Sequence, residues 1–349
     1  MSVGIAGRPI DRFHKPFVIA EMSGNHNQSL ERALTIVEAA AKAGADAIKL
    51  QTYTADTMTL DVRGGGFDVG DPDSLWAGQN LHELYKQAHT PWEWHAPIID
   101  RARDLGLICF SSPFDESAVD FLEDLGTPAF KIASFENNHL PLIEKAASTG
   151  KPLIISTGMA SLGELEDAVR TARNAGCTKL ILLKCTSTYP ATPANTNIRT
   201  IPHLREMFDC EVGLSDHTMG LGVAVAAVAL GATVVEKHFT LDRSEGGVDS
   251  AFSLEPEEMA SLVQETERAW QSLGKVSYGA TEAEESSLKY RRSIYAATDI
   301  SSGELFTEVN IRIVRPGQGA PPNLYRMLLG HPARRNYMKG TPITLDQLL

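Results

Sequence analysis

The chain of 349 residues exceeds one ordinary domain and suits one large barrel with a small appendage. Its 43% hydrophobic and 22% charged residues are typical of a globular protein. The net charge of −12 argues against binding of nucleic acid or an anionic membrane through a basic surface, although lysines in a cleft would still bind a small anion.

Short apolar runs recur along the first 240 residues. In chain order the predicted strands are 17–21, 47–52, 107–112, 129–134, 152–157, 179–185, 211–215 and 233–238. Helical patterns fill most gaps, and those of residues 29–44 and 161–176 end at glycine. Apolar strands that alternate with helices are typical of a parallel sheet covered by helices. Eight such units, with no GxGxxG after any strand, predict an α/β fold of the (β/α)8 TIM-barrel type rather than a doubly wound dinucleotide-binding sheet.

A long connection separates the second predicted strand from the third. Residues 54–90 include the Gly- and Asp-rich stretch DVRGGGFDVGDPDSLW. Connections of this length in a compact domain are usually functional or disordered. Because this one follows the carboxyl end of a strand, we expect it to lie over the C-terminal mouth of the barrel.

The strand–helix pattern stops near residue 275. The polar stretch that follows predicts a linker over 276–288 between a barrel domain, residues 1–275, and a second domain, residues 289–349. Residues 289–349 hold nine Lys or Arg against four Asp or Glu, a net charge of +5, which leaves −17 for residues 1–288. A domain of about sixty residues has a marginal core alone, so we expect it to pack on the barrel or on a partner chain.

Cysteine usage and hydropathy indicate a cytoplasmic protein. Cys109, Cys177, Cys185 and Cys210 have no CxxC spacing and read as free thiols. The N-terminal MSVGIAGRPIDRFHK lacks the apolar core of a signal peptide. The longest uncharged run, residues 219–235, is interrupted by glycines and stops short of a membrane span, so we expect no membrane partner.

Polar side chains cluster where the predicted strands end. They are Glu21, Asn25, Lys49, Gln51, Ser111, Lys131, Ser134, Glu136, Ser156, Thr157, Lys184, Thr186, Ser215, His217, Glu236 and His238. In a barrel all carboxyl strand ends open into one mouth. A single lysine there is more often ion-paired than functional, but three lysines with several hydroxyls predict a site for a phosphate and a carboxylate.

Two histidines, His217 and His238, follow the seventh and eighth predicted strands. Neighbouring strands lie about 4.8 Å apart, so both imidazoles can converge on one ion. A lone core histidine is usually structural, but this matched placement predicts an open metal site for Mn, Fe, Co or Zn. Asp216 and Glu236 are candidates for the layer behind these ligands.

The motifs AEMSGNHN, AIKLQTY, FKIASFENNHLPLI, IISTGMAS, CTSTYP, GLSDHT, EKHFTLD and DSAFSLEP stand in one order along the chain. In that order they resemble the sialic acid (N-acetylneuraminate) synthase family over nearly the whole length. The stretch RRSIYAATDISSGELFTEVNIRIVRPGQG is similar to the C-terminal antifreeze-like (SAF, β-clip) domain of that family. Within the family, TADTMTLD, LYKQAHTPWEWH and GGVDSAFSLEP look most like pseudaminic acid synthases.

The resemblance implies condensation of phosphoenolpyruvate with an open-chain amino sugar, giving a nonulosonic acid and phosphate. For the pseudaminic acid branch the acceptor is 2,4-diacetamido-2,4,6-trideoxy-L-altrose; N-acetylneuraminate and legionaminic acid synthases use manno-configured sugars. The residues that match phosphoenolpyruvate-binding positions are Lys49, Lys131, Ser134, Ser156 and Ser215, with Lys184 at a further site position. Gln51, Tyr189 and Asp249 match sugar-binding positions, and Glu21 joins the substrate-binding residues by its place at a strand end.

Four more positions acquire roles from the resemblance. His217 and His238 match ligands of a divalent ion, usually Mn²⁺ or Mg²⁺, with Co²⁺ a further candidate. Glu136 matches a proposed acid/base, and Arg315 matches an SAF-domain arginine that enters the partner's active site in a domain-swapped homodimer.

Three other functions fit parts of the pattern. A Schiff-base aldolase would use Lys131 as its nucleophile, but the histidine pair counts against this reading. A zinc hydrolase lacks an HExxH motif and a third ligand. A sugar-binding paralogue without catalytic activity is expected to have lost Lys49, His217 or His238, and this chain keeps all three.

Overall fold

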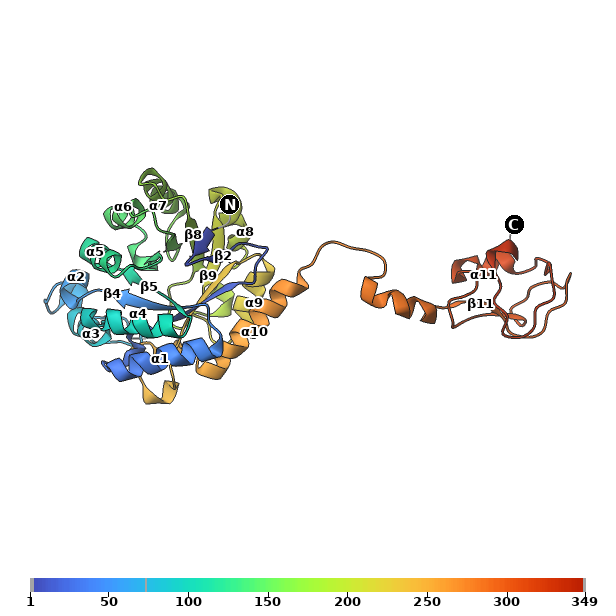
Figure 1. Ribbon diagram of the computed structural model, residues 1–349, viewed down its shortest axis with the longest axis horizontal. Coiled ribbons are helices and arrows are strands. Elements are labelled where there is room, and N and C mark those ends of the chain that lie inside the picture. The colour runs from blue at the N-terminus through green and yellow to red at the C-terminus, as the bar shows by residue number, and fades with distance from the viewer. Residues whose placement is uncertain (1–2, 73, 348–349) are drawn as a thin grey trace. The chain divides into compact units, whose positions relative to one another are not determined.

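The computed structural model describes residues 3–72 and 74–347. Two compact units make up the chain, Met1–Gly274 and Lys275–Leu349. The first contains a closed barrel of eight parallel strands surrounded by helices, and the second contains a small antiparallel sheet (Figure 1). Within the described ranges, no helix is both long enough and apolar enough to cross a membrane.

The barrel strands follow one another in chain order around the barrel. They are β3 (Phe17–Glu21), β4 (Ala47–Thr52), β5 (Ile108–Pro113), β6 (Phe130–Ile132), β7 (Leu153–Ser156), β8 (Leu180–Cys185), β9 (Glu211–Ser215) and β10 (Val234–His238). β10 pairs with β3 in parallel, with Val234 opposite Phe17, and so closes the barrel. The predicted TIM barrel is therefore confirmed, and β3, β4 and β9 begin and end at the predicted residues.

Helices connect successive strands and cover the outside of the barrel (Figure 1). They are α1 (Leu30–Ala43), α4 (His95–Asp104), α5 (Glu116–Asp124), α6 (Leu140–Ser148), α7 (Leu162–Asn174), α8 (Thr200–Phe208) and α9 (Gly222–Ala229), followed by α10 (Pro256–Ser272). α1 begins and ends at the residues expected from the sequence. The Ser29 hydroxyl caps its start by accepting a hydrogen bond from the Arg32 amide, and Gly44 ends it with φ of 85°.

Side chains alternate between the outside and the inside of the barrel along each strand. This alternation gives an outer apolar layer, an inner apolar layer and an inner polar layer. Side chains such as Val18, Ile48 and Leu182 face outward and pack on the helices. Side chains of the other parity, such as Phe17 and Ile154, fill the lower barrel interior. Toward the carboxyl strand ends the inward positions become polar, and these are Glu21, Lys49, Lys131, Ser156, Ser215 and Glu236. The functional layer is thus a continuation of the same inward-facing rows.

An N-terminal hairpin, β1 (Val3–Ile5) and β2 (Arg8–Ile10), was not among the predicted elements. Its apolar side chains Val3, Ile5 and Ile10 are buried in one cluster with the inward residues at the amino ends of the barrel strands. The hairpin therefore closes the end of the barrel opposite the site. Three-residue strands carry too little periodicity to be recognised from sequence.

The connection between β4 and β5 contains α2 (Ala55–Met58) and α3 (Leu81–Ala88). Its Trp76 Nε1 donates a hydrogen bond of 3.0 Å to the carbonyl of Val248, and its ring lies 6.0 Å from that of Tyr189. Because Val248 and Tyr189 both follow carboxyl strand ends, the connection lies at the C-terminal mouth, as expected.

In the second unit, which starts at Lys275, a short helical segment overlaps the end of the predicted linker, residues 276–288. A 3-10 helix covers Glu282–Tyr290, and the Thr281 and Glu284 side chains cap its start. β11 (Ser293–Ala296) and β12 (Ile311–Val314) then pair in antiparallel fashion, and α11 (Tyr325–Leu328) follows. The core of the unit contains Ile294, Phe306, Ile311, Leu328, Tyr337 and Ile343. The small C-terminal domain expected from the sequence is therefore present, and its sheet is antiparallel.

The hairpin that closes the barrel yields a stability prediction. Ile5→Ala should lower the free energy of unfolding by about 2–5 kcal/mol, because it leaves a cavity among fully buried neighbours. Phe13→Ala, which truncates a side chain that is 84% exposed, should change it by less than about 0.5 kcal/mol. Equilibrium urea unfolding measures both, and equal effects would contradict a packed role for the hairpin.

Candidate active site

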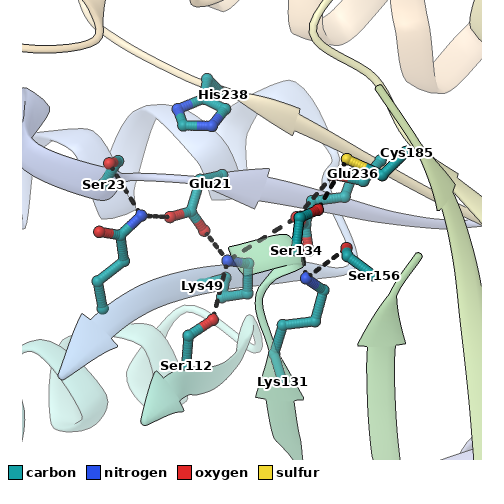
Figure 2. Close-up of polar contacts among 12 residues, drawn as sticks. Glu21, Ser23, Lys49, Ser112, Lys131, Ser134, Ser156, Cys185, Glu236 and His238 are labelled. Atoms are coloured by element: carbon teal, nitrogen blue, oxygen red, sulfur yellow. Dashed lines mark hydrogen bonds and ion pairs between the residues drawn. The ribbon is translucent and has the colours of Figure 1, made fainter. Parts of the chain in front are cut away.

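Lys49, on β4, stands in the middle of the polar layer (Figure 2). Its Nζ lies 2.6 Å from Glu21 Oε2 and 3.8 Å from Glu236 Oε1, and it donates a hydrogen bond of 3.2 Å to Ser112 Oγ. All four side chains are buried. A buried ammonium group requires such partners, because transfer of an unpaired charge out of water is very costly.

Lys131, on β6, is the second buried ammonium group. Its Nζ donates a hydrogen bond of 2.7 Å to Ser156 Oγ and lies 3.7 Å from Glu236 Oε1. The same Glu236 oxygen accepts a bond of 3.2 Å from Ser215 Oγ. Glu236 was expected behind the metal ligands; the structure instead places its carboxylate between the two lysines (Figure 2).

In this cluster two lysines are balanced by two carboxyl groups, and the protein shifts the pKa values of these groups in different directions. Burial raises the pKa of Glu21 to about 7, in spite of its ion pair with Lys49. Burial also acts to raise the pKa of Glu236, but Lys131 and Lys49 outweigh it and hold that pKa below its usual value. Burial lowers the pKa of Lys131. The cluster therefore combines two cations with hydroxyl donors at the bottom of the mouth, which suits a small anion.

His217 and His238 meet above this cluster, with ring centroids 5.3 Å apart. His217 Nδ1 donates a hydrogen bond of 2.9 Å to the carbonyl of Thr186, which leaves Nε2 as the free acceptor. His238 Nδ1 is buried without a hydrogen-bond partner and lies 3.7 Å from Asp249 Oδ2. The structure thus brings both predicted ligands together. Asp216 lies elsewhere and pairs with Lys237 at 2.9 Å.

Gln51, Asp249 and Tyr189 line the side of the mouth next to the histidines. Gln51 Nε2 donates to Glu21 Oε1 at 2.9 Å and to Ser23 Oγ at 3.0 Å, and the Ser23 hydroxyl donates to Asp249. The Tyr189 ring lies 4.5 Å from the His217 ring. This wall offers hydroxyl, amide and carboxylate groups, which suit the many hydroxyls of a sugar.

Glu136 follows β6 and has a carboxylate oxygen, Oε2, that is buried without a hydrogen-bond partner. Burial raises the pKa of this carboxyl to about 7, although Lys131 acts to lower it. A carboxyl group with that pKa exchanges a proton readily near neutral pH. Ser134, two residues earlier, donates a hydrogen bond of 3.1 Å to Cys185 Sγ, on the side of the site toward β8.

Lys184, which matched a further site position, does not join the cluster. Lys184 has the outward parity of Leu182, and its Nζ donates to the carbonyl of Cys185 at 2.6 Å. Arg315 belongs to the second unit and is exposed there. Strand parity explains the position of Lys184, because Cys185 occupies the inward position of β8.

Three residues of the site were not among the predicted strand-end residues. These are Ser23, Ser112 and Cys185. Ser112 and Cys185 continue the inward rows of β5 and β8, so counting in steps of two from the apolar interior would have identified them. Ser23 follows the end of β3, where no such periodicity exists.

Comparison with known proteins assigns both parts of the chain. Residues 36–278 match the NeuB family and residues 291–349 match the SAF domain. A pseudaminic acid synthase of Campylobacter jejuni is 45% identical over 93% of this chain and 94% of its own length. A pseudaminic acid synthase of Helicobacter pylori is 41% identical over 95% of this chain and 98% of its own.

A solved structure supports the same assignment. The N-acetylneuraminic acid (sialic acid) synthetase from Leptospira borgpetersenii, in complex with citrate, superposes with a TM-score of 0.73. It is 31% identical, and the match covers 82% of this chain and 95% of that one. The similarity thus extends over sequence and three-dimensional fold.

The buried carboxyl of Glu136 makes stability depend on pH. Its folded-state pKa of about 7 lies above the ordinary value of 4.5, so the folded protein binds this proton more tightly than the unfolded chain. The carboxyl therefore costs stability progressively as pH rises from about 4.5 through about 7. Glu136→Gln removes this cost, so the stability of the variant relative to the wild type should increase as pH rises across that range.

Urea unfolding of both proteins at several pH values measures the difference. Glu257→Gln, which alters an exposed carboxylate, controls for the change in net charge. A Glu136→Gln difference that stays constant with pH would show that Glu136 has an ordinary pKa.

Proposed function

Because the chain belongs to the NeuB family, we propose that it condenses phosphoenolpyruvate with 2,4-diacetamido-2,4,6-trideoxy-L-altrose to give pseudaminic acid and phosphate. The observation that carries this proposal is the anion site of Lys49 and Lys131 directly beneath the paired histidines. Identities of 45% and 41% to pseudaminic acid synthases of two species support the choice of acceptor. The alternative is a manno-configured acceptor, as in N-acetylneuraminate or legionaminic acid synthases.

Phosphoenolpyruvate fits the deep part of the mouth by its charge. Its phosphate and carboxylate both require cations, and Lys49 and Lys131 provide two within one buried layer. The hydroxyls of Ser156 and Ser215, which now bond to Lys131 and Glu236, can donate to the same oxygens. The walls exclude water, which strengthens these contacts.

The amino sugar fits the upper wall, where Gln51, Tyr189 and Asp249 lie. Its C1 carbonyl would point toward the histidines, and C3 of phosphoenolpyruvate would approach from below. The new bond joins these two carbons. Holding both reactants in this order turns a bimolecular step into an intramolecular one.

The residues present fit a divalent ion such as Mn²⁺, Mg²⁺ or Co²⁺. His217 Nε2 is free to coordinate, and the buried His238 ring has an unpaired nitrogen. Among the described residues no group of three or more His, Cys, Asp or Glu is arranged around one ion, so substrate and water oxygens would complete the shell. When bound, the ion would polarise the sugar carbonyl and neutralise its developing oxyanion.

Glu136 is the proposed proton acceptor. As C3 of phosphoenolpyruvate attacks, its C2 becomes electrophilic and is captured by water, whose proton passes to Glu136 and from there to the new alkoxide of the sugar. The tetrahedral intermediate then loses phosphate by cleavage of the bond between C2 and oxygen. The buried, unpartnered Oε2 of Glu136 and its pKa of about 7 support this role.

A Schiff-base aldolase is the second candidate, because burial lowers the pKa of Lys131. Against it, Lys131 Nζ is already engaged by Ser156 and lies close to Glu236. Borohydride treatment with substrate present would trap an imine in an aldolase and leave a synthase unmodified.

The proposed assembly is a homodimer in which each second unit covers the partner's barrel mouth. Large apolar side chains are exposed in loops after three carboxyl strand ends, namely Phe135, Met159 and Met219. Exposed apolar groups around one opening mark an interaction surface. Residues 289–349 carry +5 and residues 1–288 carry −17, so complementary charge favours the contact. Arg315 would then offer its guanidinium to the partner's substrate.

The proposed location is the cytoplasm. All four cysteines are free thiols, and Cys109, Cys177 and Cys185 are buried. Free thiols are usual in reducing compartments. No nucleic-acid or membrane partner is needed for this reaction.

Phosphate release from phosphoenolpyruvate tests the function and the acceptor together. The diacetamido trideoxy altrose sugar should give a kcat/KM at least about a hundredfold above that of N-acetylmannosamine, because polar contacts discriminate more strongly than apolar ones. Each sugar is supplied separately, and the product is identified by mass spectrometry. Equal values would indicate a different acceptor, and no release with any of the sugars would overturn the synthase proposal.

Removal of the metal should abolish condensation. EDTA treatment is expected to stop phosphate release and Mn²⁺ or Mg²⁺ to restore it. His217→Ala and His238→Ala should each weaken Mn²⁺ binding by at least about tenfold in calorimetric titration, while the exposed His203→Ala should not. Full activity in a metal-free preparation would rule out the metal.

Subunit mixing tests the shared active site. Arg315→Ala and Lys131→Ala should each be inactive alone. After subunit exchange, half of the dimers in an equal mixture are mixed and one of their two sites is intact, so about a quarter of wild-type activity should return. No recovery after verified exchange would show that Arg315 does not complete the partner's site.

A further inference from the structure

A buried ion pair lies next to the paired histidines and takes no part in the proposed reaction. Lys237 Nζ lies 2.9 Å from Asp216 Oδ2, and the two side chains are 1% and 0% exposed. Lys237 precedes His238 on β10, and Asp216 precedes His217 just after the end of β9. Each member of the pair is therefore the chain neighbour of one predicted metal ligand.

The pair lies on the helix side of the barrel wall. Along β10, Lys237 has the same parity as Val235, and after β9 Asp216 has the same parity as Leu214. Val235 and Leu214 belong to the outer apolar layer, whereas the histidines face the mouth. The wall thus separates the pair from the proposed substrates, and the pair acts on the imidazoles through the backbone that they share.

The Lys237 ammonium group holds the loop that carries His217. Besides Asp216, its Nζ donates hydrogen bonds to the carbonyls of Thr218, at 2.6 Å, and Gly220, at 3.0 Å. All three of its protons therefore have acceptors. Asp216 Oδ1 in turn accepts bonds from the Thr218 amide, at 2.9 Å, and the Thr218 hydroxyl, at 2.8 Å. These contacts fix the segment from Asp216 to Gly220 to β10.

The ammonium group continues the connection between β9 and β10 where strand pairing ends. The pairing ends at Glu236, whose carbonyl accepts a bond of 2.9 Å from the Asp216 amide. Beyond this bond, the loop is joined to β10 by its hydrogen bonds to Lys237 Nζ. On its other side, the His217 carbonyl accepts a bond of 2.9 Å from the Ala191 amide. The separation of the two imidazoles therefore depends on the ammonium group.

We propose that Lys237 and Asp216 are positioning residues that hold His217 and His238 at the separation that one shared divalent ion requires. This inference rests on the proposed function, which places the ion between the two rings. The affinity of a site that takes two ligands from the protein depends on how closely these ligands are held in place before the ion binds. Because the two charges cancel within the pair, it fixes the loop without adding net positive charge beside a cation.

Calorimetric titration of the substrate-free protein with Mn²⁺ tests the positioning role. Lys237→Met removes all three hydrogen bonds but keeps the apolar stem, and it should raise the Kd for Mn²⁺ about 10-fold or more. The double variant Asp216→Asn/Lys237→Met leaves no unpaired buried carboxylate and should raise the Kd by a similar factor, because it loses the same contacts. Asp216→Asn alone, the mildest change, should raise it about 3-fold.

Activity measured against Mn²⁺ concentration gives a second readout. Half-maximal phosphate release by Lys237→Met should require about 10-fold more Mn²⁺ than the wild type requires. At saturating Mn²⁺, kcat and KM for phosphoenolpyruvate should lie within about 2-fold of the wild-type values. A residue that acted directly on the reactants would instead lower kcat at every metal concentration.

The double variant Arg205→Met/Glu211→Gln is the matched control. Arg205 and Glu211 form another ion pair, of 3.2 Å, at the amino end of the same strand, with side chains 17% and 11% exposed. Urea unfolding should show that both double variants lose stability, but the control should keep the wild-type Kd for Mn²⁺.

Unchanged Mn²⁺ affinity in the folded Lys237 and Asp216 variants, or an equal loss of affinity in the control, would overturn the positioning role while the synthase proposal stands. A wild-type protein that releases phosphate but binds no Mn²⁺ would overturn the metal site, and the positioning role with it.

Discussion

Two buried ammonium groups share one carboxylate in the upper barrel, and the site is organised around that arrangement. Glu236 Oε1 lies 3.8 Å from Lys49 Nζ and 3.7 Å from Lys131 Nζ. Without this carboxylate and Glu21, neither lysine could remain charged in a layer that excludes water. Hydroxyls of Ser112 and Ser156 satisfy further protons. The paired carboxylates thus keep two ammonium groups charged inside the barrel, where an incoming phosphate can bind them, and apolar layers below exclude water.

Chemistry changes in order from the bottom of the mouth to its rim. Charged groups lie deepest and the imidazoles lie above them, with Tyr189 beside His217 and Gln51 bonded to Glu21. The Trp76 ring lies next to Tyr189, with ring centroids 6.0 Å apart. This order matches the proposed reaction, in which an anion binds below and a neutral sugar closes over it. Reactive carbons therefore meet beside the histidines, where polarisation of the carbonyl is useful.

The residues proposed for the reaction and those next to the proposed acceptor sugar come from different parts of the chain. Strand ends hold Lys49, Lys131, His217 and His238, whose positions are fixed by barrel registers. The connection between β4 and β5 instead supplies Trp76, whose ring lies 6.0 Å from that of Tyr189. A loop can change without disturbing strand pairing, so the acceptor can vary in a family while the condensation is retained. Exposed apolar side chains in loops after the strand ends, such as Met159, would serve a third role, the proposed dimer contact.

The sequence by itself determined the eight strands, the barrel and most of the strand-end residues, because apolar runs and helix caps are local signals. Only the tertiary structure decided which strand-end side chains face inward: Lys184 points out while Cys185 points in, although they are neighbours. It also showed that Glu236, which was expected behind the metal ligands, lies between the two lysines. The wall of the mouth joins Ser23, Gln51 and Asp249, and no local pattern reports contacts between segments so far apart in the chain.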